Sequence, residues 1–147
     1  MSKVETMLNR ELWIQLVDFG LLVFIWTIQL VVYPSFRYFP ADSLLKWHGT
    51  YTSAVSIIVM PLMITQLTFH AWRVYDSFSH GNLLLLLLVI GTWAVTFVIF
   101  VPLHNKISLG HELTESLANL VLYNWIRTAL WGLIFLIGLF IRHESMV

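Results

Sequence analysis

Two histidines and one arginine are the side chains in this sequence best suited to chemistry in an apolar setting, and we take them as candidate catalytic residues. His48 and His104 lie at the ends of long apolar runs. An imidazole there can transfer a proton near neutral pH, ligate a metal or hold the iron of haem b. Arg127 lies within an apolar run, and an arginine at the centre of a membrane helix costs about 2.5–3.5 kcal/mol. We therefore expect Arg127 to hold an anion or the oxygen of a carbonyl or quinone, with Trp131 one turn further on for cation–π packing.

Each of these residues also has a simpler alternative role. A histidine at the end of a membrane span is often an interfacial hydrogen-bonding residue, and no His-x-x-x-His or Glu-x-x-His pattern accompanies His48 or His104. Arg127 can instead extend to the membrane surface, or cross-link helices through Asn124 and Gln29. The chain has no cysteine, so any metal would have to use His, carboxylate, Met or amide ligands.

The composition places these residues in a membrane protein. Of the 147 residues, 59% are apolar and 11% are charged, whereas about 25% are charged in an ordinary soluble domain. A soluble fold of this length could not cover so much apolar surface, but a helix surrounded by lipid needs no polar exterior. The formal net charge is zero, so nothing indicates a nucleic-acid partner. We expect the lipid bilayer to surround the chain.

Four apolar stretches are long enough to cross a bilayer, which takes about 20 residues of helix. They cover approximately residues 12–32, 48–72, 83–101 and 117–141. Pro34 and Pro102 are expected to end the first and third stretches, because proline lacks an amide proton and disfavours helix before it. Pro40 and Asp42 predict an early start of the second helix. With short connections of roughly ten to fifteen residues, residues 1–147 are predicted to form one all-α domain, an integral membrane four-helix bundle in up-down-up-down order.

Helical spacing turns the polar residues of all four stretches toward the bundle interior, because polar groups facing lipid are costly. The alternating helix directions then bring one set of them into a single layer, on the side away from the termini. The predicted ligand-binding residues of this layer are amides, phenols and an indole: Gln29, Tyr33, Tyr51, Asn105, Asn124 and Trp131. We expect them to surround one cavity with His48, His104 and Arg127, and the cavity to open toward the two longer loops.

A second polar cluster is predicted on the termini side of the bundle. It would contain Asp18 and His70, with Gln15 and Gln66 beside them. The two clusters together would outline an ion or proton path. The gap between them is apolar and argues against a continuous path, since it is lined by Leu22, Val59 and Met63.

Four short stretches carry a family resemblance. They are residues 46–51, 60–63, 101–106 and 123–128, which read KWHGTY, MPLM, VPLHNK and YNWIRT. These stretches resemble a family of small bacterial four-helix membrane proteins and, more widely, the group that contains the fungal anthrone oxygenases. The resemblance implies oxidation of an electron-rich polycyclic phenol by dioxygen. Pro102, Asn105, Asn124 and Arg127 match the shared pattern, and His104 stands where the oxygenases more often have an amide.

Three functions follow from these features. The first is a membrane oxidoreductase for a lipid-soluble aromatic or quinone-like molecule, in which Arg127 and Asn124 hold the substrate oxygen and His48 or His104 removes a proton. The second is a protein that holds haem b or a metal between His48 and His104. The third is a homo-oligomeric or accessory subunit of a larger membrane complex, in which the polar layer only locks the helices together.

The basic residues give a slight indication of orientation. Those on the termini side are Lys3, Arg10, Arg73 and Arg142, and those on the opposite side are Arg37, Lys46 and Lys106. Cytoplasmic segments of membrane proteins carry the excess of Lys and Arg. We expect both termini in the cytoplasm and, with the bacterial resemblance, a location in the inner membrane.

Overall fold

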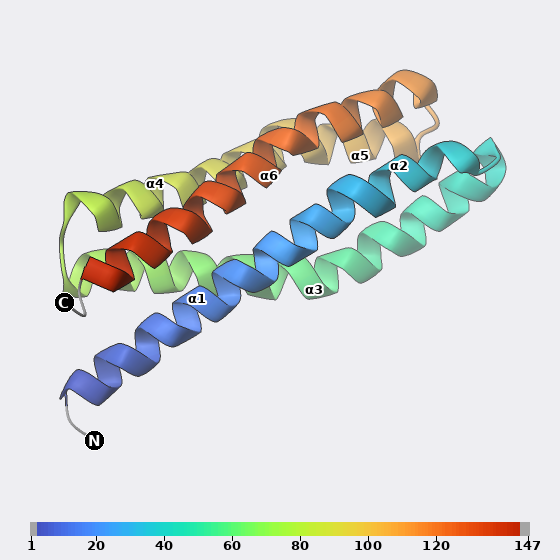
Figure 1. Ribbon diagram of the computed structural model, residues 1–147. Coiled ribbons are helices and arrows are strands. Elements are labelled where there is room, and N and C mark those ends of the chain that lie inside the picture. The colour runs from blue at the N-terminus through green and yellow to red at the C-terminus, as the bar shows by residue number, and fades with distance from the viewer. Residues whose placement is uncertain (1–2, 145–147) are drawn as a thin grey trace.

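The computed structural model describes residues 3–144, with the side chains of residues 9–142, and this part of the chain contains helices and short connections but no strand. Four helical rods within it are long and apolar enough to cross a membrane: Asn9–Tyr38, Ala41–Asp76, His80–Ser108 and Leu113–Arg142. The rods lie side by side and alternate in direction, with both chain ends at the same end of the bundle (Figure 1). The prediction of an all-α four-helix membrane bundle is confirmed.

Two of the four rods are built from several helical segments. The first consists of α1 (Lys3–Thr27), the π turn η1 (Ile28–Val32), α2 (Tyr33–Ser35) and the 3-10 turn η2 (Phe36–Tyr38). The second is α3 (Ala41–Asp76). The third consists of α4 (His80–Val95), the π turn η3 (Thr96–Phe100) and α5 (Val101–Ser108), and the fourth is α6 (Leu113–Glu144). Both α1 and α4 pack against α3 and α6, so the rods close into a ring around one interior.

The rods are longer than the apolar runs predicted, and the connections between the rods are shorter than predicted. Within the described chain, residues 39–40, 77–79 and 109–112 connect one rod to the next. The helices continue past the apolar runs because their polar ends are capped. The Ser79 hydroxyl accepts a hydrogen bond from the Asn82 amide at 3.1 Å, and Asp42 lies in the first turn of α3, where its charge suits the helix dipole. The early start of α3, directly after Pro40, agrees with the prediction.

Pro34 and Pro102 do not end their helices, contrary to the prediction, because a π turn precedes each of them. A proline ring clashes with the carbonyl four residues earlier, which belongs here to Leu30 or Val98. Both of these residues lie within a π turn, η1 or η3, where one extra residue widens the backbone. The helix therefore accommodates each proline and continues, and the side chains beyond the turn are rotated relative to those before it.

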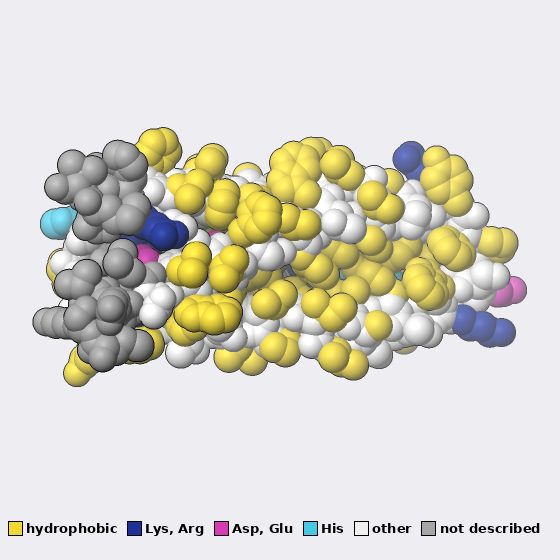
Figure 2. All heavy atoms as spheres, turned by 60° about the horizontal axis from the view of Figure 1, so that its bottom comes forward, with side chains coloured by type: hydrophobic (Ala, Val, Ile, Leu, Met, Phe, Trp, Pro, Cys, Tyr) yellow, Lys and Arg dark blue, Asp and Glu magenta, His cyan; other side chains and the backbone are white. Residues whose placement is uncertain are grey.

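Apolar side chains cover the outside of the bundle as well as its core. Ile57, Val98 and Phe140 are 75%, 74% and 72% exposed. Figure 2 shows hydrophobic side chains over the middle of one face, with charged side chains gathered toward its two ends. An exterior of this kind is stable against lipid and unstable against water. The chain is an integral membrane protein.

Candidate functional site

A chain of hydrogen bonds runs through the bundle end that lies away from the termini. The Tyr33 hydroxyl lies 3.3 Å from His104 Nε2, and His104 Nδ1 lies 2.9 Å from His48 Nε2. His48 Nδ1 lies 3.2 Å from the hydroxyl of Ser108. Tyr33 and His48 are buried, whereas Ser108 is exposed at the end of α5. Because both ring nitrogens of each histidine are bonded, a proton can pass in either direction between Tyr33 and the surface at Ser108.

Aromatic rings hold these hydrogen-bonded side chains in place. Phe100, the last residue of η3, lies one helical turn before His104, and its ring stacks on Tyr33 with centroids 6.4 Å apart. The Phe36 ring packs edge-on against His48, with centroids 6.2 Å apart. Offset and edge-on packing of this kind favours particular ring orientations. The π turn η3 and the segment after η1 therefore position the two imidazoles and the phenol together.

Arg127 connects this series of hydrogen bonds to a layer of buried amides. Its Nε and one terminal nitrogen donate to Asn124 Oδ1 at 3.0 and 2.7 Å, and the same terminal nitrogen donates to the Tyr33 hydroxyl at 3.3 Å. Asn124 Nδ2 donates to Gln29 Oε1 at 2.8 Å, which links α6 to η1. The guanidinium also lies 3.8 Å above the centre of the Phe100 ring. Arg127 is thus held by neutral oxygens and an aromatic face.

Arg127 has no carboxylate partner among the residues whose side chains the structure describes. The ion pairs of that part of the chain join Arg10 to Glu11 and Asp76, Arg73 to Glu11, Lys106 to Glu112, and His70 to Asp18. Asp42 and Glu115 are exposed near the ends of their helices. Arg127 is only 9% exposed, and a buried charge is costly until it is paired. Its positive charge therefore favours a negatively charged or strongly polarised oxygen beside it.

A cavity of about 240 Å³ lies against Arg127, Tyr33 and His104. Its inner wall includes Phe24, Ile28, Met63, Phe100 and Trp131, and its exposed lining residues are Ser56, Phe97, Val101 and Asn105. Those exposed residues come from α3 on one side and from η3 and α5 on the other. The cavity therefore opens sideways, between two helices and toward lipid. A separate cavity of about 570 Å³, lined by Tyr33, Arg37, Phe39 and Leu113 among others, lies at the end with the two predicted longer loops, so the opening expected on that side belongs to a different cavity.

The remaining predicted ligand-binding residues take different places. Tyr51 is 7% exposed and lines the cavity, with its ring centroid 6.5 Å from that of His104. Trp131 lies 5.9 Å from the Arg127 guanidinium, as the cation–π expectation required. Asn105 is exposed at the cavity rim. Asn124 and Gln29 do not line the cavity; they support Arg127 from behind.

Ser108 was not predicted as part of the site. The third helix was expected to end near Pro102, which placed Ser108 in a loop. Its position one helical turn after His104 would have indicated it, had the helix been extended through the proline. Phe100 lies one helical turn before His104, but its contact with Arg127 depends on how α6 packs against η3.

The two imidazoles do not fit the axial positions of haem. Their nearest nitrogens are 2.9 Å apart and share a hydrogen bond. A haem iron held between them, with one nitrogen on each side of its ring at about 2 Å, would need a separation of about 4 Å and room for the ring. No group of three or more His, Asp or Glu side chains suited to a metal occurs in the described residues.

A second polar cluster occupies the termini side, as predicted, although Gln15 belongs elsewhere. Asp18 contacts His70 and accepts a hydrogen bond from Gln66. Gln15 instead accepts a hydrogen bond from Arg142. The predicted apolar gap is bridged on one side, because the Trp131 indole donates to Gln66 Oε1 at 3.1 Å. Trp131 therefore contacts both polar clusters.

Comparison with family models, curated proteins and solved structures finds no match to this chain.

Proposed function

We propose that this chain is a membrane oxidoreductase that binds a lipid-soluble aromatic molecule through a phenol or quinone oxygen beside Arg127. The single observation that supports it most is a buried guanidinium that lines a lipid-facing cavity and has only neutral partners among the described residues. A hydrogen bond to a charged group contributes about 1.5–3 kcal/mol. An oxygen that carries partial or full negative charge fits this place better than a hydrocarbon does.

The cavity size and its opening suit a small ring system. Ligand pockets for drug-sized molecules hold about 300–1,000 Å³, so a cavity of about 240 Å³ suits one or two fused rings. Aromatic and methionine side chains line it, including Phe97, Trp131 and Met63. An apolar tail on the ring would extend through the sideways opening into lipid. Entry from the bilayer needs no aqueous channel.

The chemistry that we assign starts with removal of a phenolic proton. The proton passes to the chain of Tyr33 and His104 and leaves through His48, while the phenolate that remains is stabilised by Arg127. A phenolate gives up an electron more readily than a phenol does. Transfer of one electron to dioxygen, which dissolves in the bilayer, yields a phenoxyl radical and superoxide held side by side. Their combination forms a carbon–oxygen bond and a ring peroxide, which takes a proton back from His104 and loses water as its oxygen–oxygen bond breaks, leaving a quinone. The resemblance to the anthrone oxygenase group fits the same reaction class.

Two measurements on the protein in lipid nanodiscs test this proposal. Quenching of tryptophan fluorescence by 1,4-naphthoquinone reports binding, and oxygen consumption with 1-naphthol reports turnover. Arg127→Gln should weaken naphthoquinone binding about 10- to 100-fold, which corresponds to the hydrogen bond to a charged group. Arg37→Gln is the matched control, since Arg37 is exposed on η2 and outside this cavity. Wild-type protein that neither binds the quinone nor consumes oxygen would contradict the proposal.

The alternative of a non-catalytic accessory subunit is supported by a different observation. Gln29 donates to the Val121 carbonyl at 3.2 Å and accepts from Asn124, so these bonds join η1 to α6 whether or not a ligand binds. If the alternative holds, Arg127→Gln alters stability or assembly and leaves no ligand effect to measure.

We also propose the bacterial inner membrane as the location, with both termini in the cytoplasm. The support is the small excess of basic residues on the termini side, where Arg73 lies near the end of α3, together with the bacterial resemblance.

A further inference from the structure

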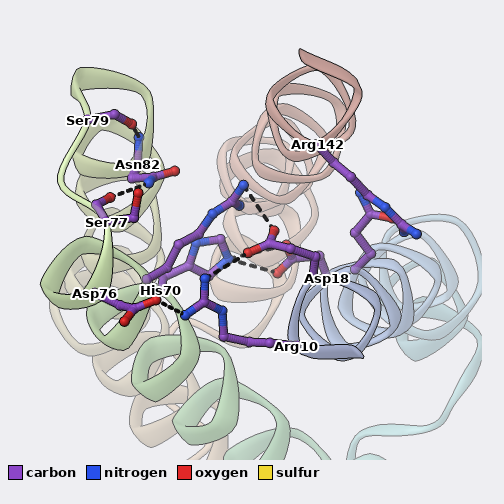
Figure 3. A network of polar contacts seen from close by, with 11 residues as sticks. Arg10, Asp18, His70, Asp76, Ser77, Ser79, Asn82 and Arg142 are labelled. Carbon is purple, nitrogen blue, oxygen red and sulfur yellow. Dashed lines mark hydrogen bonds and ion pairs between the residues drawn. The ribbon is translucent and has the colours of Figure 1, made fainter. Parts of the chain in front are cut away.

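Asp18 and His70 form a buried acid–base pair on the termini side of the bundle, outside the proposed reaction. Each is 1% exposed. His70 Nε2 lies 3.3 Å from Asp18 Oδ1 and 3.2 Å from Oδ2, which joins α3 to α1 (Figure 3). An isolated carboxylate is expensive inside a membrane, so a buried aspartate is a functional candidate together with its partner. A carboxylate beside a neutral imidazole has a charge of −1. The pair therefore carries no net charge once it has bound one additional proton.

The neighbouring hydrogen bonds determine where that proton can lie. The Trp131 indole can only donate, so its bond at 3.1 Å identifies the facing atom of Gln66 as Oε1. The Gln66 amide nitrogen then donates to Asp18 Oδ1 at 2.7 Å. Oδ1 is therefore an acceptor, so a proton carried by the Asp18 carboxyl group belongs on Oδ2, which faces His70 Nε2. His70 Nδ1 is buried and has no hydrogen-bond partner within the described residues, so the imidazole is held there by Asp18 alone.

The charged groups around the pair are largely matched to one another. On α1 and α3, Arg10 pairs with Asp76, and Arg73 pairs with Glu11 at 3.0 Å. From α6, Arg142 bonds to Gln15. Figure 3 shows Arg10 and Arg142 on either side of Asp18, and Asn82 of α4 bonded to the 77–79 connection. α6 itself approaches Asp18 through Gly138, where a Cβ would lie 3.9 Å from Oδ2. His70 is thus the titratable side chain in direct contact with the Asp18 carboxylate.

We propose that Asp18 and His70 form a proton-binding site, and that Gln66 and Trp131 couple its occupancy to the charge of the ligand beside Arg127. The path of contact is short: Asp18 to Gln66, Gln66 to Trp131, and Trp131 to the Arg127 guanidinium. Negative charge in the cavity favours proton uptake by the pair, because the two charges interact across a medium of low dielectric constant. The coupling rests on the proposed function, but the proton site does not.

The proton site is tested on the unliganded protein in nanodiscs by nitrogen-15 NMR of its histidine rings between about pH 5 and 8, the range in which histidine titrates. The His70 signals, identified by their loss in His70→Gln, should shift with pH in one transition, and Asp18→Asn should move that transition. Asp42→Asn is the matched control at an exposed aspartate and should leave the transition in place. His70 signals that stay constant throughout this range in the wild-type protein would overturn the proton site, whether or not the variants fold.

The coupling is tested with 2-naphthoate, a ring compound with a permanent negative charge near neutral pH. Its binding is measured by competition with 1,4-naphthoquinone. Bound naphthoate should move the His70 transition to higher pH in the wild-type protein, and the shift should be smaller in Gln66→Leu, a change at a residue that does not itself line the cavity. Naphthoate that binds without moving the transition overturns the coupling. If naphthoate and naphthoquinone both fail to bind, the proposed function and the coupling fall together, while the proton site is judged by the unliganded titration.

Discussion

His48 Nε2 and His104 Nδ1 lie 2.9 Å apart, so an imidazole from α3 and one from α5 are joined by a direct hydrogen bond inside the bundle. Each ring uses its second nitrogen for another partner, Tyr33 on one side and Ser108 on the other. A pair that served only as interfacial residues would face the headgroups instead. The arrangement connects a cavity that opens to lipid with the surface at one membrane face.

Interrupting this connection should slow turnover without affecting binding. His48→Phe fills the same volume but cannot carry a proton, so oxygen consumption with 1-naphthol should fall about 100-fold, the lower end of the range for acid–base catalysis. Binding of 1,4-naphthoquinone should stay as in the wild type, because His48 does not line the cavity. Equal losses of binding and turnover would mean that His48 has only a structural role.

Ser108→Ala should have a smaller effect on the same turnover rate, because water can replace an exposed hydroxyl beside His48. Ser53→Ala is its control: the Ser53 hydroxyl is exposed and bonds only to the Gly49 carbonyl of its own helix, at 3.0 Å, among the described contacts. Turnover that falls equally in both variants would show that Ser108 does not act through His48.

Asn124 should contribute more to stability than its size suggests. It accepts from Arg127 and donates to Gln29, and Asn124→Leu leaves both partners unsatisfied in a buried position. Such a loss costs about 1–3 kcal/mol, which thermal or denaturant unfolding in detergent can measure. Asn105→Leu is the control, since Asn105 is exposed and such substitutions usually stay within about 0.5 kcal/mol. Equal stability of the two variants would contradict the hydrogen bonds of this layer.

The π turn η3 should be necessary for the position of His104. Deletion of Val98 removes the extra residue of that turn and leaves a regular helix, in which the ring of Pro102 clashes with the carbonyl four residues earlier and kinks or ends the helix before His104. The ring of His104 then turns away from His48 and Tyr33, so naphthoquinone binding and 1-naphthol oxidation should both be lost. Val98→Ala keeps the turn and only shortens a lipid-facing side chain that is 74% exposed, so it should retain both. A deletion variant that folds and keeps full activity would show that the extra residue is dispensable.

The orientation can be measured by cysteine labelling, because the chain has no cysteine of its own. Ser77→Cys and Leu109→Cys place single thiols in connections at opposite ends of the bundle, both exposed. In intact bacterial cells, a membrane-impermeant thiol reagent should label position 109 and label position 77 only after the membrane is opened. The reverse pattern would place the termini outside the cytoplasm.

The sequence alone determined the four spans and the inward direction of the polar residues. Long apolar runs have few alternatives to membrane helices, and lipid penalises polar side chains such as Gln29 and Asn124 wherever they do not face the interior. Alternating helix directions then placed His48 and His104 at the same level. These inferences follow from local periodicity and from the properties of lipid as a solvent. None of them requires knowledge of which atoms of neighbouring helices meet.

Only the tertiary structure decided which atoms meet. The bond between His48 and His104 depends on the π turn η3, which forms because Pro102 cannot fit a regular helix in this packing, and no local pattern distinguishes that outcome from a helix end. The sideways opening of the cavity and the bond from Trp131 to Gln66 depend on how α3, η3 and α6 pack against one another. Contacts between distant segments are set by the complementary shapes of whole helix surfaces, which residue types and spacing do not specify.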